Sequence, residues 1–168
     1  SAATYAPSLS YRMAAIIARI ERARLGSRNS SEILRYLSFG SFNRLFKPSR
    51  TEADWLSRDP QQVDAYVADS LCGSTLSTQS WVDFLDALGS LFSAASLRLL
   101  DPNRPLLVMS GERDPVGGQG KKIHALCSKL AKAGLRELQI ELYPGARHEI
   151  FNELNRDEVQ KNLLSWLD

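Results

Sequence analysis

Two polar residues in the second half of the chain, Asp114 and His148, have the types and the setting that acid–base chemistry requires. Asp114 follows a short apolar run that ends at Ser110, and His148 follows an alternating run that ends near Leu142. If these runs are neighbouring parallel strands, about 4.8 Å apart, the loops that leave their carboxyl ends emerge side by side. A carboxylate beside an imidazole accepts the Nδ1 proton, fixes the tautomer and stabilises the imidazolium that forms when Nε2 takes a proton from a nucleophile. The sequence therefore predicts that Asp114 and His148 meet.

Two other acids near this position are less well placed than Asp114. Glu112 lies nearer the apolar run, and Asp101 lies at its amino end, on the wrong side of a parallel sheet. Asp114 is followed by Pro115 and then by glycines, which favours a carboxylate held on a turn. Asp114 is therefore the preferred acid.

The second histidine and the glycine-rich stretch suggest other chemistries that the spacing does not support. His124 falls in the middle of a predicted helix, which favours a structural or partly exposed role. Two histidines without matched carboxylate spacing do not make a metal site, so no metal or organic cofactor is implied. Residues 117–122 fail the phosphate-loop pattern, because Pro115 stands where its first glycine belongs and Lys122 where Ser or Thr should bind magnesium. We therefore do not expect nucleotide binding.

The elements that must position Asp114 and His148 alternate between strand and helix. The prolines in residues 101–105 exclude a helix there, and the apolar run 105–110 is typical of a strand buried on both faces. An amphipathic helix ending at Gly134, a strand over residues 138–142 and a last helix capped by Asn155 follow. Two parallel strands cannot stand alone, so the pattern predicts further sheet from a segment preceding Ser1.

Residues 1 to about 100 are predicted to be wholly helical. A first helix has apolar residues at three- and four-residue spacing from Leu9 to Ile20, and a second ends at Gly40. Further helix starts are predicted from capping patterns. These starts are a Thr51/Asp54 capping box, an Asp59-Pro60 cap, and a Ser80/Asp83 capping box ahead of a longer helix.

Composition bounds the function classes. The chain has 168 residues, of which 43% are hydrophobic and 24% charged, a composition typical of globular proteins. Its net charge of +2 does not indicate a nucleic-acid partner. The arginines in the first fifty residues are read as a solvated helix face. No apolar run approaches the roughly 18 residues of a membrane span, and no signal peptide opens the chain. Cys72 and Cys127 form no disulfide framework or zinc unit, so buried, reduced thiols and a cytoplasmic location are expected.

The two loops also carry a family resemblance. Ser-Gly-Glu-Arg-Asp-Pro-Val at residues 110–116 and Tyr-Pro-Gly-Ala-Arg-His-Glu-Ile-Phe-Asn-Glu at 143–153 resemble the acid and histidine loops of α/β-hydrolases in the lysophospholipase and monoacylglycerol lipase group. The preceding helices resemble the cap that this group inserts after its sixth strand. The resemblance implies an α/β fold, namely the carboxyl-terminal portion of an α/β-hydrolase: a helical cap at 1–78 and a core segment at 79–168. It also implies that Asp114 is the acid and His148 the general base of a catalytic triad.

One part of the family pattern is missing from the sequence. The G-x-S-x-G motif that carries the nucleophile should precede the cap, and no such pentad occurs. Gly40-Ser41 and Gly73-Ser74 lack its flanking residues, and the first oxyanion-hole loop is missing too. We therefore expect an amino-terminal core segment outside this chain to supply the serine, and the chain alone to be inactive.

The resemblance thus implies a serine hydrolase of carboxylic esters, acting on small acyl esters such as long-chain acylglycerols or lysophospholipids. Two alternatives stay open. One is a non-catalytic hydrolase-like protein that uses the cap pocket for binding, and the other is a related chemistry such as that of a peptidase or a haloperoxidase. Several apolar cap residues could line an acyl pocket or could equally be internal packing. These residues are Leu37, Phe39, Phe42, Leu45 and Phe46.

Overall fold

The computed structural model describes residues 9–168, and the second half of the chain is built on two parallel strands. Strand β1 (Leu106–Gly111) pairs with β2 (Leu138–Tyr143) along their whole length, so both strands end at the same edge. Gly134 lies outside the elements, as predicted, and β1 begins and ends one residue later than the predicted run 105–110. The strands and their parallel pairing match the sequence prediction.

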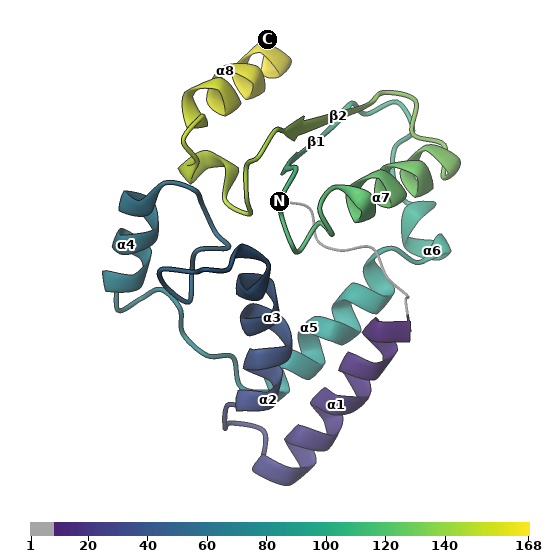
Figure 1. Cartoon of the computed structure of the whole chain (residues 1–168). Helices are drawn as coiled ribbons and strands as arrows, with labels where there is room; N and C mark the ends of the chain where they lie inside the picture. Colours follow the sequence, from purple (N-terminus) through teal and green to yellow (C-terminus); the bar gives the residue numbers. More distant parts are fainter. Residues whose placement is uncertain (1–8) are drawn as a thin grey trace.

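Helices cover both faces of this two-stranded sheet. Helix α7 (Lys121–Lys132) packs on one face, where Val108, Ile123 and Cys127 form a buried cluster. Helix α8 (Arg156–Leu167) contributes Val159 to a second cluster that includes Met109 of β1. Figure 1 shows the strands between α7 and α8. The sheet is thus the middle layer of this half.

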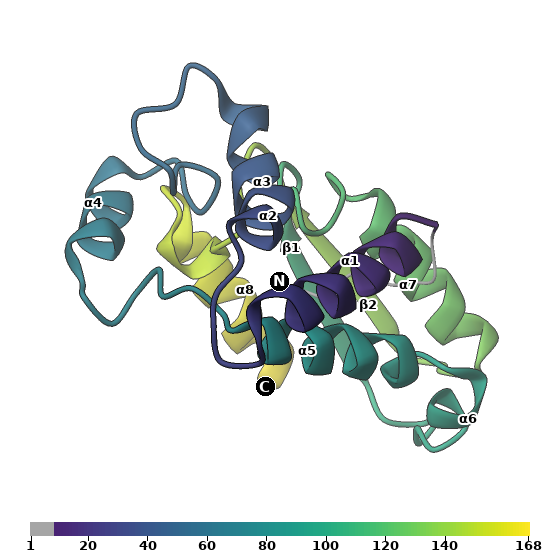
Figure 2. The same ribbon diagram turned by 90° about the horizontal axis from the view of Figure 1, so that it is seen from below.

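A pair of long helices dominates the first half. Helix α1 (Leu9–Leu25) ends before Gly26, which has a φ of 85°, and it packs against α5 (Thr78–Leu91). Figures 1 and 2 both show the two helices side by side, and the short helix α6 (Ala94–Leu97) leads from α5 towards β1. Their shared core consists of Ala15, Ala18, Leu34, Trp81, Val82 and Leu85. The packing joins residues on both sides of the predicted boundary at 78/79, which stays a prediction.

The second predicted helix is longer than the sequence suggested. It runs as α2 (Glu32–Arg35), a π-helical turn (Tyr36–Gly40), α3 (Ser41–Asn43) and a 3₁₀ turn (Arg44–Phe46). The prediction that Gly40 ends this helix is wrong, because Gly40 has right-handed helical backbone angles and the chain continues through it. A glycine lowers helix stability without stopping a helix unless the chain adopts a positive φ there.

The capping patterns had mixed outcomes. Asp59 caps α4 (Pro60–Ala68) by accepting a hydrogen bond from the Gln61 N–H, as predicted. Asp54 does accept hydrogen bonds from Thr51, but residues 51–56 form turns, so the helix predicted there is wrong. Asn155 precedes α8 as expected, although its side chain bonds to Glu158 and makes no cap hydrogen bond.

The start of α5 also differs from the prediction. Its N-cap is Ser77, three residues before the predicted Ser80, and the Ser77 hydroxyl accepts the Ser80 N–H. The Thr78 hydroxyl donates to the Gly26 carbonyl oxygen, and the Thr78 N–H donates to that of Asn29. These contacts with the end of α1 are long-range, which explains why the local capping pattern gave the wrong start.

Two further expectations concern the first half. Residues 1–8, part of the predicted cap, lie outside the described residues. The arginines of residues 12–50 are exposed except for Arg35, which is half-buried, as the solvated-face interpretation predicts.

Within residues 9–168, no helix is both long enough and apolar enough to cross a bilayer.

Candidate active site

Asp114 lies on the loop that follows β1, and its side chain is fully buried. The loop folds back on the strand through a hydrogen bond from the Asp114 N–H to the Gly111 carbonyl oxygen. The Val116 N–H donates to Oδ1 of Asp114 at 2.8 Å, and the buried Ser110 hydroxyl lies 3.5 Å from Oδ2. The carboxylate is therefore held by its own loop before any contact from β2 is considered.

His148 lies on the loop that follows β2, which interlocks with the Asp114 loop. The Arg113 N–H donates to the Ala146 carbonyl oxygen at 2.8 Å. Gly111 lies so close to this loop that a Cβ atom on it would lie 2.0 Å from the Arg147 carbonyl oxygen. Such a distance is far inside van der Waals contact, so only glycine permits the two backbones to approach in this way.

The two side chains meet as the sequence predicted. Nδ1 of His148 lies 3.0 Å from Oδ1 of Asp114. An ionised carboxylate can only accept a hydrogen bond, so in the neutral imidazole Nδ1 carries the proton and Nε2 is the basic nitrogen. The His148 side chain is 25% exposed, whereas that of Asp114 is 0% exposed. This arrangement has the geometry of an oriented general base; the catalytic roles of both residues stay predictions.

The environment of Asp114 favours its ionised form. Burial raises the pKa of the Asp114 carboxyl, because a buried charge loses hydration. The hydrogen bond and the charge of His148 lower that pKa, and so do the backbone N–H groups of Val116 and Gly117. The lowering effects outweigh burial, so the pKa of Asp114 lies below its usual range.

The rival acids have other surroundings. The Glu112 carboxylate is exposed and accepts the Gly145 N–H at 3.1 Å, which ties the two loops together away from the imidazole. Asp101 is exposed before β1 and accepts the Asn103 N–H. Asp114 is thus the acid that reaches His148.

Sequence reasoning missed Trp55, which comes from the helical half. Its ring centroid lies 4.9 Å from that of His148. The Glu149 N–H donates to the Leu56 carbonyl oxygen at 2.8 Å, and the His148 N–H to that of Trp55 at 3.4 Å. The histidine loop is therefore bound to residues 55–56. The only local signal for this segment was the capping pattern before Trp55, and that pattern predicted a helix start instead of a contact with His148.

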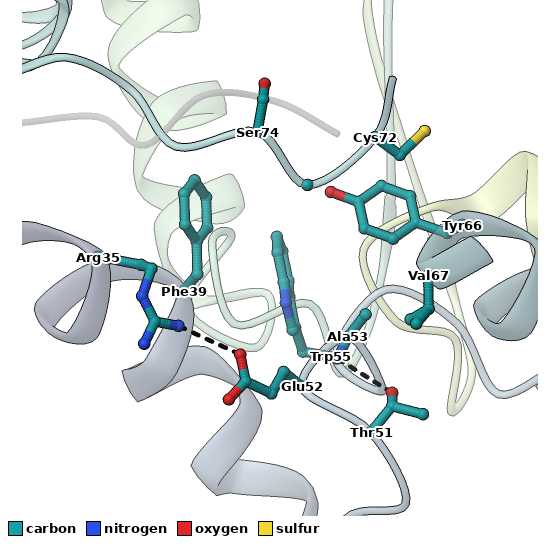
Figure 3. A pocket seen from close by; sticks show the side chains of 11 residues that line it. Arg35, Phe39, Thr51, Glu52, Ala53, Trp55, Tyr66, Val67, Cys72 and Ser74 are labelled. Atoms are coloured by element: carbon teal, nitrogen blue, oxygen red, sulfur yellow. Dashed lines mark hydrogen bonds and ion pairs between the residues drawn. The ribbon is translucent and has the colours of Figure 1, made fainter. Parts of the chain in front are cut away.

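Trp55 also lines a cavity of about 630 Å³ in the helical half. Figure 3 shows its ring between Phe39 and Tyr66, with Arg35 and Glu52 paired at one side. The cavity lining combines aromatic and aliphatic side chains with a few polar ones, as small-molecule sites usually do. One side chain therefore contacts both the cavity and the imidazole.

The structure separates the apolar residues whose role was left open. Phe39 lines the cavity, whereas Phe42 and Phe46 pack into the cluster around Trp55. Leu37 and Leu45 are exposed. The interpretation as pocket lining thus holds for Phe39, and internal packing for Phe42 and Phe46.

The remaining candidates behave differently from one another. Cys127 is buried, as predicted, but Cys72 is half-buried and lines the cavity, because residues 69–74 form an irregular segment over it. Burial, and next the Asp69 carboxylate, raise the pKa of the Cys72 thiol.

The second histidine, His124, is exposed on α7. Across residues 9–168, no cluster of three or more His, Cys, Asp or Glu side chains is arranged to hold a metal ion.

Comparison with known proteins identifies the family. The family model described as serine aminopeptidase, S33, matches residues 2–155. The chain belongs to this family of α/β-hydrolases. A curated relative, the monoacylglycerol lipase of Mycolicibacterium smegmatis, is 30% identical over 119 residues, covering 69% of this chain and 39% of that protein.

Solved structures show the same fold. A highly thermostable carboxyl esterase of Bacillus coagulans superposes with a TM-score of 0.83 at 20% identity, over 99% of this chain and 54% of the esterase. The monoacylglycerol lipase of Paleococcus ferrophilus gives a TM-score of 0.59 at 20% identity, with the same coverages. The predicted family and fold class are confirmed, and the chain spans about half the length of these structures and 39% of the curated relative.

Proposed function

We propose that this chain provides the acid and the general base of a serine hydrolase that cleaves carboxylic esters. The observation that carries the proposal is the buried Asp114 carboxylate hydrogen-bonded to Nδ1 of His148. With Nδ1 donating to the carboxylate, Nε2 is the ring nitrogen that would exchange a proton with a nucleophile. Membership of a hydrolase family and the similarity to a monoacylglycerol lipase support this chemistry.

The proposed reaction follows from these roles. A serine hydroxyl from an amino-terminal core segment outside the 168 residues attacks the acyl carbon while its proton passes to Nε2 of His148. His148 then gives that proton to the departing alcohol, which leaves an acyl-enzyme. A water molecule attacks the acyl-enzyme, with His148 again taking and returning the proton, and releases the acid. Asp114 keeps its negative charge throughout and stabilises the imidazolium.

The proposed substrates are small esters with long acyl chains, such as monoacylglycerols or lysophospholipids. The cavity supports this class, because Phe39 and Trp55 give it an apolar wall and the Trp55 ring also packs against His148. The helices of residues 1–78 would act as the cap that covers this site. The two cysteines are free thiols, which suits the proposed cytoplasmic location.

Labelling with a fluorophosphonate tests the proposal in the complete protein. Replacing His148→Ala should abolish or severely reduce labelling, because the serine loses its base. The matched control is His124→Ala, which removes an exposed histidine and should leave labelling intact. Unchanged labelling of the His148 variant would remove His148 from the mechanism.

A binding protein of the same fold is the second candidate, favoured by the cavity that Phe39 and Trp55 line. Such a protein would use the cavity beside Trp55 without chemistry. It would bind a long-chain fatty acid and yet show no fluorophosphonate labelling in the complete protein. Labelling together with release of fatty acid from a monoacylglycerol supports the hydrolase, and faster cleavage of an amino-acid amide would instead support a peptidase.

A further inference from the structure

A fully buried carboxylate accepts a hydrogen bond from the backbone of the residue that precedes His148. Glu153 follows β2 in the segment that leads to α8, and its side chain is 0% exposed. Its Oε1 accepts the N–H groups of Arg147 at 2.8 Å and of Arg58 at 3.1 Å. Its Oε2 accepts Nε of Arg58 at 2.7 Å. A charge in the interior is unfavourable unless it is paired and hydrogen-bonded. The donors from Arg147 and Arg58 compensate for the burial of the Glu153 carboxylate.

The partners of Glu153 belong to the two segments that surround His148. Arg147 is the residue before His148 in the chain. Arg58 belongs to the loop of residues 53–59, which also carries Trp55. One carboxylate therefore ties the histidine loop to the loop whose tryptophan packs on the imidazole.

Arg147 is held on its other side as well. Its guanidinium donates to the carbonyl oxygens of Asp54 and Ser57, the latter at 3.0 Å, and lies 4.3 Å from the centre of the Phe46 ring. The residue before His148 is thus fixed through both its backbone and its side chain. The peptide that carries the imidazole has little freedom to rotate.

The restraint on the histidine loop matters because the other partner of the His148–Asp114 hydrogen bond, the Asp114 carboxylate, is held by its own loop. Asp114 is held by the Val116 N–H on its own loop and cannot follow a moving imidazole. The distance from Nδ1 to Oδ1 therefore depends on how the histidine loop is held. We infer that Glu153, together with Arg58, is a positioning residue that holds His148 in line with Asp114. The inference rests on the proposed function, in which His148 is the base.

A simpler interpretation is that Glu153 only anchors the helical half to the α/β half. The structure offers a matched control for that interpretation. Arg156 donates to the Asp59 carboxylate at 2.9 Å and to the Glu153 backbone carbonyl oxygen at 3.2 Å, so it joins the same two segments through groups other than the Glu153 carboxylate. Arg156→Gln should lower the melting temperature and leave His148 in place.

The test uses the complete protein with Glu153→Gln, which keeps the shape but loses the charge. Turnover of a soluble short-chain ester should fall about 10- to 100-fold with KM changed less than about threefold, because a small misplacement of a catalytic group has effects of that size. The downfield proton resonance of His148 Nδ1–H should weaken or disappear in Glu153→Gln and persist in Arg156→Gln. Arg58→Lys, which keeps the charge but loses Nε, should show the same loss in milder form.

The outcomes separate the two hypotheses. If Glu153→Gln and Arg156→Gln lose stability alike while both keep the resonance and normal turnover, the positioning role is overturned. If Glu153→Gln does not fold, Arg58→Lys decides by the same two measurements. The proposed function fails separately, if His148→Ala retains fluorophosphonate labelling. Even then, the Nδ1–H resonance of His148 in Glu153→Gln and in Arg156→Gln still reports the position of the ring.

Discussion

The Trp55 ring packs against the His148 imidazole with 4.9 Å between centroids, and the same ring forms a wall of the cavity. Trp55 is 7% exposed and also contacts Phe39 and Phe42. This one side chain therefore joins the candidate acyl pocket to the candidate base.

Replacing Trp55→Ala should affect stability and catalysis together. Loss of a buried tryptophan lowers the free energy of unfolding by about 3–5 kcal/mol. Turnover should also fall, because the His148 imidazole would lose the ring against which it packs. Trp55→Phe should restore most of both. Thermal unfolding and ester hydrolysis measure the two effects; full activity in the alanine variant would show that the ring contact does not matter for His148.

Asp114→Asn tests which acid serves His148. The variant should fold, because an amide oxygen can still accept the Val116 N–H. Turnover should fall by about four orders of magnitude, since the amide favours the wrong histidine tautomer. Glu112→Gln is the control and should keep near-normal turnover, because Glu112 bonds to Gly145. A reversal of these two results would mean that Glu112 is the acid.

The pKa of Asp114 predicts a pH dependence of stability. Because the pKa of Asp114 is lower in the folded state than in the unfolded chain, the folded protein binds fewer protons there. The stabilisation is fully present above the ordinary aspartate pKa of about 3.9 and is lost as pH falls through the lowered value. The part of the unfolding free energy that the Asp114 carboxylate contributes should therefore fall only below about pH 4. Denaturant titrations of the protein and of Asp114→Asn between about pH 2 and pH 5 measure it, and a difference between the two proteins that does not shrink below about pH 4 would contradict the assignment.

Gly111→Ala should disrupt the site without touching either functional side chain. The added Cβ would lie 2.0 Å from the Arg147 carbonyl oxygen, so the loop that carries His148 must move. We expect a marked loss of both stability and turnover. Gly40→Ala is the control: the backbone there is helical and the added Cβ would lie 3.2 Å from Cδ2 of the exposed Tyr36 ring, which has room to shift, so stability should change by no more than about 0.5–1 kcal/mol. Equal behaviour of the two variants would show that the loops have room to separate.

Phe39→Ala should change substrate preference more than chemistry. Phe39 lines the cavity, so its truncation should raise KM for long-chain esters and leave short-chain esters almost unaffected. Leu45→Ala removes an exposed side chain and is the control. Comparison of KM across a series of acyl chain lengths measures the effect. A uniform change across the series would indicate that the cavity does not hold the acyl chain.

The parts of the site on the sheet could be predicted from sequence because their signals are local. The apolar run of β1 and the alternation of β2 indicate strands, and parallel strands end at one edge, so Asp114 and His148 had to come close. The fold of the second half followed from the same patterns.

The missed parts depend on contacts between distant segments. Glu153 looks like an ordinary surface residue, because glutamate is rarely buried unless it is paired, and its partner Arg58 lies in the other half of the chain. Trp55 follows a real capping pattern, but the backbone there bonds to Glu149 and forms turns. The start of α5 moved for the same reason, since Thr78 bonds to Gly26.

The close approach of Gly111 to the Arg147 carbonyl oxygen has a consequence for engineering. Neither loop can be exchanged for that of a homologue by itself, because each backbone shapes the space available to the other. Residues 111–114 and 145–148 form one transplantable unit, and a graft that moves only one of them would bring mismatched backbones into collision.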